Sequence, residues 1–357
     1  MRGAHKFILA LLLAGGSCAW ADRDSPFPDR GDAYLTFYLE NDLFAGTDRN
    51  YTNGARLSWV SGARPVSALG SVQRLLRGFS GDEDSFHIVQ LLTGFDAPDE
   101  VEYNYGFSLT QLMFTPEDDR FPGQPAGERP YAAWTGIGFS LHAMDANVLN
   151  SAELTLGVIG PHALGEETQD FVHDLKGVPK FAGWDAQIPD EITLNYYFVQ
   201  KRRIDLKIRE LKTGAFRASA LWDWGMAVGN FRTHAETGAF FRAGWNLPAD
   251  FSDPRLSETA YSHRYFTGRE NTADFSIYAL AGARARASLF DATLDGPLFS
   301  DFDTRVQREG LTGEVFAGMG LRWNCWELSY VQTFQTESFE EQAGGQQFGS
   351  LALRRAF

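Results

Sequence analysis

The segment EVFAGMGLRWNCWELSYV, residues 314–331, contains two runs in which apolar residues alternate with small or polar residues. The apolar positions of the first run are Val315, Ala317, Met319, Leu321 and Trp323. Those of the second run are Trp326, Leu328 and Tyr330. Because successive side chains of a β-strand point to opposite faces, each run predicts a strand with one largely apolar face. The short Asn324-Cys325 link between the runs indicates a tight turn, so the two strands form a hairpin.

The same alternation recurs elsewhere, and the composition agrees with it. Ile137, Phe139 and Leu141 alternate with glycine and serine. Aromatic residues make up 14% of the chain, there are 36 glycines, and no segment after the N-terminal region is apolar enough for a transmembrane helix. An exported chain with these properties is typical of a transmembrane β-barrel, whose strands turn one face to lipid and the other to the interior. A soluble secreted β-sandwich or β-barrel is the alternative.

The N-terminal region has the features of a signal peptide. A basic start precedes an apolar run over 7–15, and the AWA sequence at 19–21 fits a cleavage site. We therefore expect a signal peptide over 1–21 and an outer-membrane β-barrel domain over 22–357. The net charge of −14 argues against nucleic acid as a partner.

We predict an all-β fold, a twelve-stranded antiparallel transmembrane β-barrel with a short helix in an extracellular loop. The expected strands cover residues 33–43, 51–60, 104–115, 131–142, 151–160, 190–200, 215–230, 234–246, 273–289, 310–324, 325–336 and 346–357. Twelve is even, as single-chain bacterial barrels require, and the last strand ends on the terminal Phe357. With the N-terminus in the periplasm, connections after odd strands lie outside the cell. Connections after even strands, including 61–103 and 247–272, are expected in the periplasm. Residues 84–95 could form a further strand, but we assign them to the 61–103 connection.

The segment ENDLFAGTDRNYTNG, residues 40–54, places oxygen-bearing side chains at the tip of a predicted hairpin. Gly46, Thr47 and Asp48 supply the turn. The turn does not require the polar residues on either side of it, which are Glu40, Asn41, Asp42, Tyr51, Thr52 and Asn53. Oxygen atoms from two adjacent strands can converge on a hard cation such as calcium. A polar loop that caps its own backbone is the other interpretation.

The next polar segment on the outer side is expected to contain a short helix over 165–177. Gln169 and His173 are four residues apart and share one face of this helix. Histidine exchanges a proton near neutral pH, so His173 is a candidate general base, although a solvated surface histidine would give the same pattern. We interpret Trp184 as a support for the helix and as an aromatic anchor at the membrane interface.

Four motifs follow one another across residues 40–191. They are ENDLFAGTDRNYTNG at 40–54, FTPEDDR at 114–120, ERPYAAW at 128–134, and GPHALGEETQDFVHDLKG with GWDAQI between 160 and 188. In this order they resemble the outer-membrane lipid A 3-O-deacylase family. The resemblance implies a twelve-stranded barrel that hydrolyses acyl esters of lipid A, with Ca²⁺ as the cofactor.

The resemblance also implies roles for particular residues. Asn41 and Asp42 in the tip correspond to functional positions of the family, as do Thr52 in the YTNG element and His173 in the QDFVH helix. Asp42 would hold calcium, and His173 would take the proton from an attacking water. Asn41 and Thr52 would orient the calcium, the water or the oxyanion. In a regular strand Asn41 and Asp42 point to opposite faces, so the strand must end or bulge there. A family lysine after Thr-Pro has no counterpart in this chain, where Arg120 is the nearest candidate.

The expected function is calcium-dependent hydrolysis of ester-linked acyl chains, the 3′-position acyloxyacyl group, from lipid A of lipopolysaccharide in the outer leaflet. We expect a monomer in the bacterial outer membrane, with lipid A or lipopolysaccharide as its partner. The alternatives are an outer-membrane phospholipase and a barrel without catalysis, such as a pore or an adhesin. A serine nucleophile is disfavoured because no G-x-S-x-G motif occurs. A triad of Ser140, His142 and Asp145 would lie near the periplasmic end.

Overall fold

The computed structural model describes residues 33–42, 50–65, 94, 101–117, 120–177, 179–204, 216–247, 250–251, 253–256 and 275–357. The predicted signal peptide at 1–21 and the predicted turn at 46–48 lie outside the described residues. Most of the 84–95 segment also lies outside them. These three assignments therefore stay predictions.

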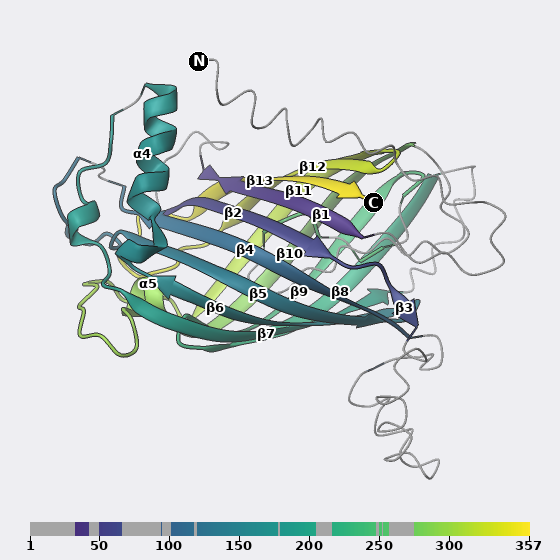
Figure 1. Ribbon diagram of the computed structural model, residues 1–357, viewed down its shortest axis with the longest axis horizontal. Helices are drawn as coiled ribbons and strands as arrows, with labels where there is room; N and C mark the ends of the chain where they lie inside the picture. Colours follow the sequence, from purple (N-terminus) through teal and green to yellow (C-terminus); the bar gives the residue numbers. More distant parts are fainter. Residues whose placement is uncertain are drawn as a thin grey trace, which may run out of the picture.

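Twelve long strands of the described chain form an antiparallel sheet that closes on itself (Figure 1). They are β1 (Tyr34–Asn41), β2 (Asn50–Val60), β4 (Glu102–Thr115), β5 (Ala132–Met144), β6 (Val148–Ile159), β7 (Glu191–Ile204), β8 (Phe216–Gly229), β9 (Arg232–Trp245), β10 (Phe275–Asp291), β11 (Leu311–Trp323), β12 (Trp326–Gln335) and β13 (Gln346–Ala356). A two-residue strand, β3 (Arg64–Pro65), extends the sheet beside the start of β4. The predicted twelve-stranded barrel is confirmed.

The barrel is closed by its first and last strands. β1 pairs with β13 from Tyr34 opposite Ala356 to Asn41 opposite Gly349. On its other side β1 pairs with β2, and β2 pairs directly with β4. Each long strand therefore has two hydrogen-bonded neighbours, and the sheet has no long free edge. A barrel in lipid needs this closure, because the hydrocarbon core offers no water to bond to an open strand.

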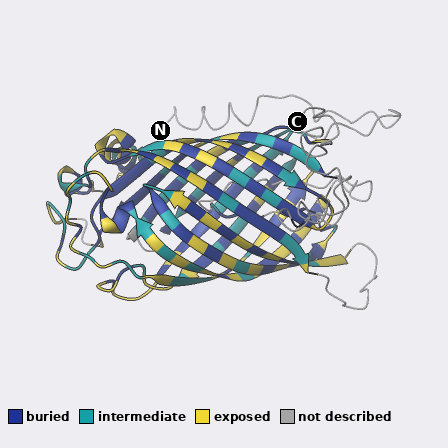
Figure 2. Ribbon diagram, turned by 90° about the horizontal axis from the view of Figure 1, so that it is seen from below, coloured by how far each residue is buried: buried dark blue, intermediate teal, exposed yellow. Residues whose placement is uncertain are grey.

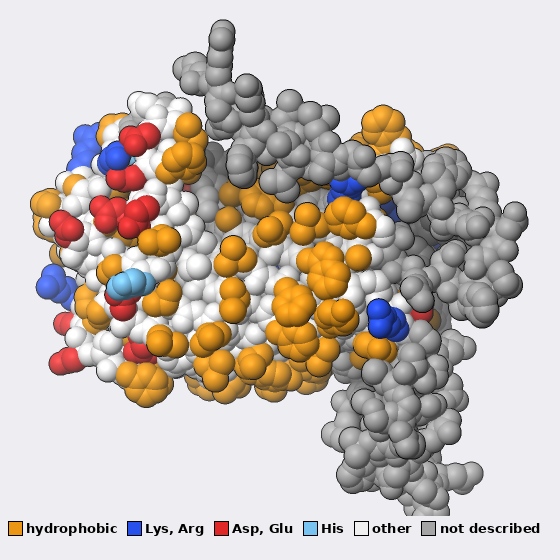
Figure 3. Space-filling view, in the orientation of Figure 1, with side chains coloured by type: hydrophobic (Ala, Val, Ile, Leu, Met, Phe, Trp, Pro, Cys, Tyr) orange, Lys and Arg blue, Asp and Glu red, His pale blue; other side chains and the backbone are white. Residues whose placement is uncertain are grey.

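The outer wall of the barrel is apolar. On β5, Ile137, Phe139 and Leu141 are exposed, whereas Ser140 and His142 between and beyond them are buried. The same alternation of buried and exposed residues runs along the other strands (Figure 2). Apolar side chains cover the side of the barrel, and charged side chains gather at the end that carries the helices (Figure 3). This distribution matches a surface that faces lipid around its waist and water at its end.

The lumen is filled by charged and polar side chains that pair between strands, some of them neighbouring and some further apart. Arg56 of β2 contacts Glu153 of β6 at 2.6 Å. Arg354 of β13 contacts Glu327 of β12 at 3.1 Å, and further pairs join other strands. Burying a charge costs free energy unless an opposite charge or several hydrogen bonds compensate it. The pairs therefore allow strands with charged inner faces to close around a narrow interior.

The connection between β9 and β10 enters this lumen, so the prediction that 247–272 lies in the periplasm is wrong for its described part. Phe251 packs in a buried cluster with residues of β5, β8 and β11. Asp253 pairs with Arg284 of β10 at 3.4 Å. The backbone N–H of Leu256 donates to Glu40 of β1 at 2.7 Å. We call the described residues 250–256 the luminal segment. It enters the lumen because its two acidic side chains, Asp250 and Asp253, meet arginines of the inner wall.

The helices of the described residues lie together at one end of the barrel (Figure 1). They are η4 (Pro161–Ala163), α4 (Gly165–Lys176), η5 (Trp184–Ala186) and α5 (Ala292–Asp295). Strand parity assigns this end to the outside of the cell, and we call it the outer end. The helix predicted over 165–177 is confirmed as α4. No helix in the described ranges is long and apolar enough to cross a membrane.

We expect the exposed wall of β5 to reject charge. Ile137 is 61% exposed and lies near the middle of the strand. Ile137→Arg should lower the free energy of unfolding by about 2–4 kcal/mol, because the guanidinium would face hydrocarbon. Urea titration of the protein folded in phospholipid vesicles measures this change. Leu298→Arg, at an exposed position in the connection after α5, is the control and should change stability by about 0.5 kcal/mol or less. Equal losses in both variants would contradict the assignment of a lipid-facing wall.

Candidate active site

The polar hairpin tip lies at the outer end, where β1 stops and β2 starts. Asn41 is the last residue of β1 and sits opposite Asn53 of β2. Asp42 follows in a helical turn and is 1% exposed. The strand therefore ends between these two residues, which removes the requirement that their side chains point to opposite faces. The structure thus meets the condition under which Asn41 and Asp42 can serve one site.

A β-bulge separates the two faces of the tip on β2. Tyr51 pairs with Phe114 and Asn53 with Met113, so Thr52 is an extra residue between the two pairs. A bulge of this kind lets consecutive residues depart from the regular alternation of a strand. Tyr51 lines a cavity in the lumen together with Phe114.

Thr52 points to the opposite side, the outer wall. Its hydroxyl shares a hydrogen bond of 2.6 Å with the hydroxyl of Thr115. Thr115 lies two residues after Met113 and hence on the same face of β4. Met113 belongs to the cluster that packs beneath helix α4, outside the lumen. The bulge therefore places Tyr51 on the inner face and Asn53 on the outer face, two positions that a regular strand would send to one face, and Thr52 lies on the outer side.

Glu40 supports the tip from inside the barrel. Its carboxylate accepts hydrogen bonds from Ser350 at 2.6 Å, from the backbone N–H of Leu256 at 2.7 Å and from the Tyr51 hydroxyl at 3.0 Å. Sequence reasoning grouped Glu40 with the outer oxygen ligands, but the structure directs its side chain into the lumen. Because Glu40 and Tyr51 precede Asn41 and Thr52, their bond fixes the spacing of the two strand ends that carry the candidate residues.

Helix α4 carries His173 on its buried face. Leu164 precedes the helix in the left-handed conformation, and Gly177 ends it in the same conformation by donating its N–H to the carbonyl of His173. The Nδ1 atom of His173 lies 2.6 Å from the carbonyl oxygen of Pro179. A carbonyl only accepts, so Nδ1 carries the proton in this bond. In the neutral ring the Nε2 atom then holds the lone pair and can act as a base.

A second hydrogen bond fixes the helix one turn earlier. The indole N–H of Trp184 donates to the Oε1 atom of Gln169 at 2.7 Å. Trp184 is 1% exposed and packs on Tyr131 with ring centroids 5.1 Å apart. The interpretation of Trp184 as a support for the helix agrees with these contacts. Its interpretation as an anchor at the membrane interface is wrong, because the ring is enclosed by protein.

The helix and the tip meet on the same part of the outer wall. Met113, which sits opposite Asn53 at the tip, packs in one cluster with Trp184 and Phe181 beneath α4. The ring of Phe181 contacts His173 edge-on at 5.1 Å between centroids. This chain of contacts links His173 to the bulged end of β2. Asn41, Asp42, Thr52 and His173 therefore all belong to the outer end, as the motifs predict.

The oxygen atoms at the tip are of the kinds that bind a hard cation. Asp42 brings a carboxylate, Asn41 an amide oxygen and Thr52 a hydroxyl, and calcium binds such oxygens at about six to eight positions. Within the described ranges, which omit residues 43–49, no group of three or more His, Cys, Asp or Glu side chains is arranged as a metal site. The described side chains thus fit part of a calcium ligand set. Calcium binding stays a prediction.

The alternative triad is not formed. His142 lies between two hydroxyls, with Ser151 at 2.8 Å from Nδ1 and Ser140 at 3.0 Å from Nε2. The carboxylate of Asp145 accepts the backbone N–H groups of Asn147 and Val148 in the turn between β5 and β6. This is the arrangement of a buried polar network and a capped turn.

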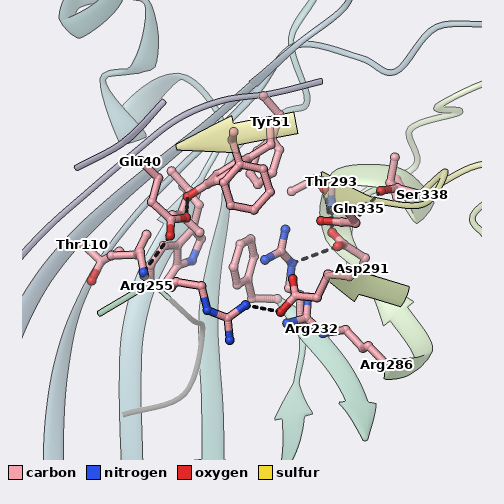
Figure 4. A pocket seen from close by; sticks show the side chains of 18 of the residues that line it. Glu40, Tyr51, Thr110, Arg232, Arg255, Arg286, Asp291, Thr293, Gln335 and Ser338 are labelled. Carbon is pink, nitrogen blue, oxygen red and sulfur yellow. Dashed lines mark hydrogen bonds and ion pairs between the residues drawn. The ribbon is translucent and has the colours of Figure 1, made fainter. Parts of the chain in front are cut away.

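A second polar region, which sequence reasoning missed, lies inside the barrel at the outer end. It is a cavity of about 120 Å³, and we call it the luminal cavity. Glu40 and Tyr51 line one side, and Arg232, Asp291 and Thr293 line the other (Figure 4). The available signal was the charged residues at inward positions of the strands, such as Arg56, whose clustering becomes visible only when the barrel is closed.

The closed barrel, its apolar waist and its charged lumen define a bacterial outer-membrane β-barrel protein. A family model described as outer membrane protein LpxR matches residues 7–357, and the chain therefore belongs to the LpxR family. This membership confirms the resemblance drawn from the motifs and the location in the bacterial outer membrane.

One solved structure supports the fold, and a second is less similar. LpxR from Salmonella typhimurium is similar with a TM-score of 0.66 and 17% identity, over 91% of this chain and 100% of that chain. The β domain of the Bordetella autotransporter BrkA is similar with a TM-score of 0.42 and 11% identity, over 92% of this chain and 100% of that chain. No protein with a curated description matches the chain. At these identities the structural likeness concerns the fold alone.

We expect the Gln169–Trp184 bond to hold α4 against the wall. Trp184→Phe removes the indole donor and leaves a buried amide without its partner, at a cost of about 1–3 kcal/mol. Amides of 165–176 should then exchange hydrogen faster, while those of β5 should not change. Trp222→Phe removes an exposed indole bond to Thr237 and serves as the matched control. Unchanged exchange in α4 after Trp184→Phe would show that the helix is held by other contacts.

Proposed function

We propose that this protein hydrolyses ester-linked acyl chains of lipid A in the outer leaflet of the outer membrane. Membership of the LpxR family and the position of helix α4 support the proposal. The observation that carries it is the bond from His173 to the Pro179 carbonyl, which leaves a basic Nε2 on the buried face of α4. A substrate anchored in the outer leaflet reaches the outer wall laterally and does not need to enter the lumen.

The residues divide the work of ester hydrolysis. His173 takes the proton of the attacking water on Nε2 and later returns it to the leaving alcohol. Nδ1 stays hydrogen-bonded to Pro179 throughout, so the ring keeps its orientation. Asn41 and Thr52 orient the water and the developing oxyanion, since an amide N–H and a hydroxyl can both donate to it. No covalent intermediate forms in this scheme.

Calcium is part of the proposal. Asp42 would hold the ion at the tip, and the amide oxygen of Asn41 and the hydroxyl of Thr52 are further candidate ligands. The chemistry supplied by a bound calcium would be polarisation of the ester carbonyl and partial compensation of the oxyanion charge. The resemblance to the family favours the 3′-position acyloxyacyl group as the chain that is removed.

The contents of the lumen argue against a pore. The luminal segment bonds to Glu40 and pairs with Arg284, so polypeptide fills the interior between the walls of the described barrel. An ion channel needs a continuous aqueous path, and paired charges with a bound segment obstruct one. A calcium-dependent phospholipase is distinguished by its product, because it releases fatty acid from phospholipid vesicles that contain no lipid A.

The first test concerns His173. His173→Gln keeps a polar side chain and removes the base, so turnover of purified lipid A should fall about 100-fold or more. Mass spectrometry of the lipid A product measures this loss. His162→Gln is the control, because His162 lies on the same connection, is exposed and pairs with Asp190 at 2.7 Å. Deacylation by His173→Gln at more than half of the parent rate would remove His173 from the mechanism.

The second test concerns calcium. Chelation should abolish deacylation, and added calcium should restore it. Asp42→Ala should abolish both the turnover and its calcium response. The variant should still fold, which is checked by the change in gel mobility that a folded barrel shows when it is heated. Asp174→Asn, an exposed carboxylate on α4, should keep the parent response. Full activity of the parent protein in excess chelator would rule out the metal.

A further inference from the structure

The luminal cavity contains an arginine whose charge is not balanced by a carboxylate. Arg129 precedes β5 and reaches inward, and it is only 3% exposed. One of its terminal nitrogens donates to the Thr293 hydroxyl at 2.9 Å, and its guanidinium lies 4.3 Å from the centre of the Phe114 ring. Within the described ranges Arg129 makes no ion pair, and its buried Nε has no hydrogen-bond partner.

A second guanidinium lies beside the first. Arg232 of β9 is 5.3 Å from the same Phe114 ring and contacts Asp291 at 2.9 Å. Asp291 also accepts the backbone N–H and the hydroxyl of Thr293. Its oxygens are therefore engaged by Arg232 and Thr293. Two cations thus share one carboxylate, which leaves a net charge of about +1 at this side of the cavity.

The protonation of Arg129 reflects this imbalance. Burial lowers the pKa of Arg129 to about 9, Asp291 opposes the shift, and Arg232 adds to it. A solvated or paired arginine keeps its proton up to about pH 12. A buried arginine with a depressed pKa is one that would gain from an added negative charge.

The other arginines of the cavity already have acidic partners. Arg56 pairs with Glu153, Arg255 with Asp253, Arg284 with Asp223, and Arg286 with Glu236. Glu40, on the opposite side, is satisfied by three hydrogen bonds. The excess positive charge is therefore confined to the Arg129 and Arg232 side.

We propose that the luminal cavity binds a phosphate-bearing anion between Arg129 and Arg232. The planar guanidinium donates in pairs to phosphate oxygens, and Arg129 has donors left for such a contact. The cavity volume of about 120 Å³ is comparable to engineered cavities of about 150 Å³ that hold one benzene molecule, so it suits a small anion. Gln335, Gln346 and Ser338 add a neutral polar wall to the same cavity, and they are hydrogen-bonded to one another. This site is separate from His173, which lies outside the lumen.

The experiment uses the full chain, folded in detergent and free of phosphate. Inorganic phosphate and methyl phosphate are titrated separately, with heat of binding and melting temperature as readouts. We expect saturable heat and a higher melting temperature in the parent protein. Stronger binding of inorganic phosphate would indicate a free ion as the ligand, and stronger binding of methyl phosphate would indicate the phosphate ester of a larger molecule.

Arg129→Met tests the residue. It keeps much of the length of the side chain and removes the charge, so the phosphate response should disappear while the melting temperature without phosphate stays equal or rises. Arg129→Lys keeps the charge without the paired donors and should bind phosphate at least 10-fold more weakly. Arg120→Met, at an exposed position of the same connection, is the control and should respond like the parent.

The opposite result follows if Arg129 only ties its loop to Thr293. Arg129→Met would then melt lower by the same amount with and without phosphate, and the parent would show no phosphate response. Absence of binding heat in the parent protein alone overturns the proposal, whichever variants fold. The same titration on His173→Gln should give the parent result, which separates this site from the proposed deacylation.

Discussion

The closed hydrogen-bond ladder is the constraint from which the rest of this structure follows. In hydrocarbon no solvent can satisfy a strand edge, so the first strand must pair with the last, and it does so from Tyr34 opposite Ala356 to Asn41 opposite Gly349. Closure then divides every strand into two environments. Exposed residues such as Ile137 meet lipid, and inward residues such as Arg56 meet one another across a narrow space. Both the apolar wall and the charged lumen are consequences of this one requirement.

The charged lumen and the outer wall are connected by hydrogen bonds near the tip of the first hairpin. Glu40 and Tyr51 bond inside the lumen, while Asn41 and Thr52, the residues that follow them, belong to the outer wall. A single bulged residue on β2 makes this possible, because it interrupts the alternation that would otherwise send Tyr51 and Asn53 to the same face. The polar interior therefore occupies the lumen and also holds the strand ends that carry Asn41 and Thr52 in position. The luminal segment takes part through the bond from Leu256 to Glu40.

Sequence patterns predict most of the architecture and a smaller part of the candidate site. Alternation at residues such as Ile137 and Met319 predicts the strands, because every second side chain of a strand faces lipid and is therefore apolar. The helix around His173 was also predicted, and the motifs led to the correct family. The luminal segment was not predicted, since residues 250–256 have no local signature and enter the lumen through partners such as Arg284, far away in sequence. Trp184 was placed in the membrane interface for a similar reason: its burial depends on a bond to Gln169 that only the folded loop reveals.

The bonds at Glu40 also bear on how the protein assembles. Its partners Ser350 and Leu256 are 310 and 216 residues away in the chain, so the carboxylate cannot be satisfied until both ends of the polypeptide and the luminal segment have arrived. Contacts of such long separation form late, since the loops they close carry a large entropic cost. The tip that Glu40 supports is hence organised only in the finished barrel. An incompletely inserted chain would therefore lack the Glu40 bonds that space the strand ends at Asn41 and Thr52, so these residues reach their final arrangement only in the membrane in which the barrel is complete.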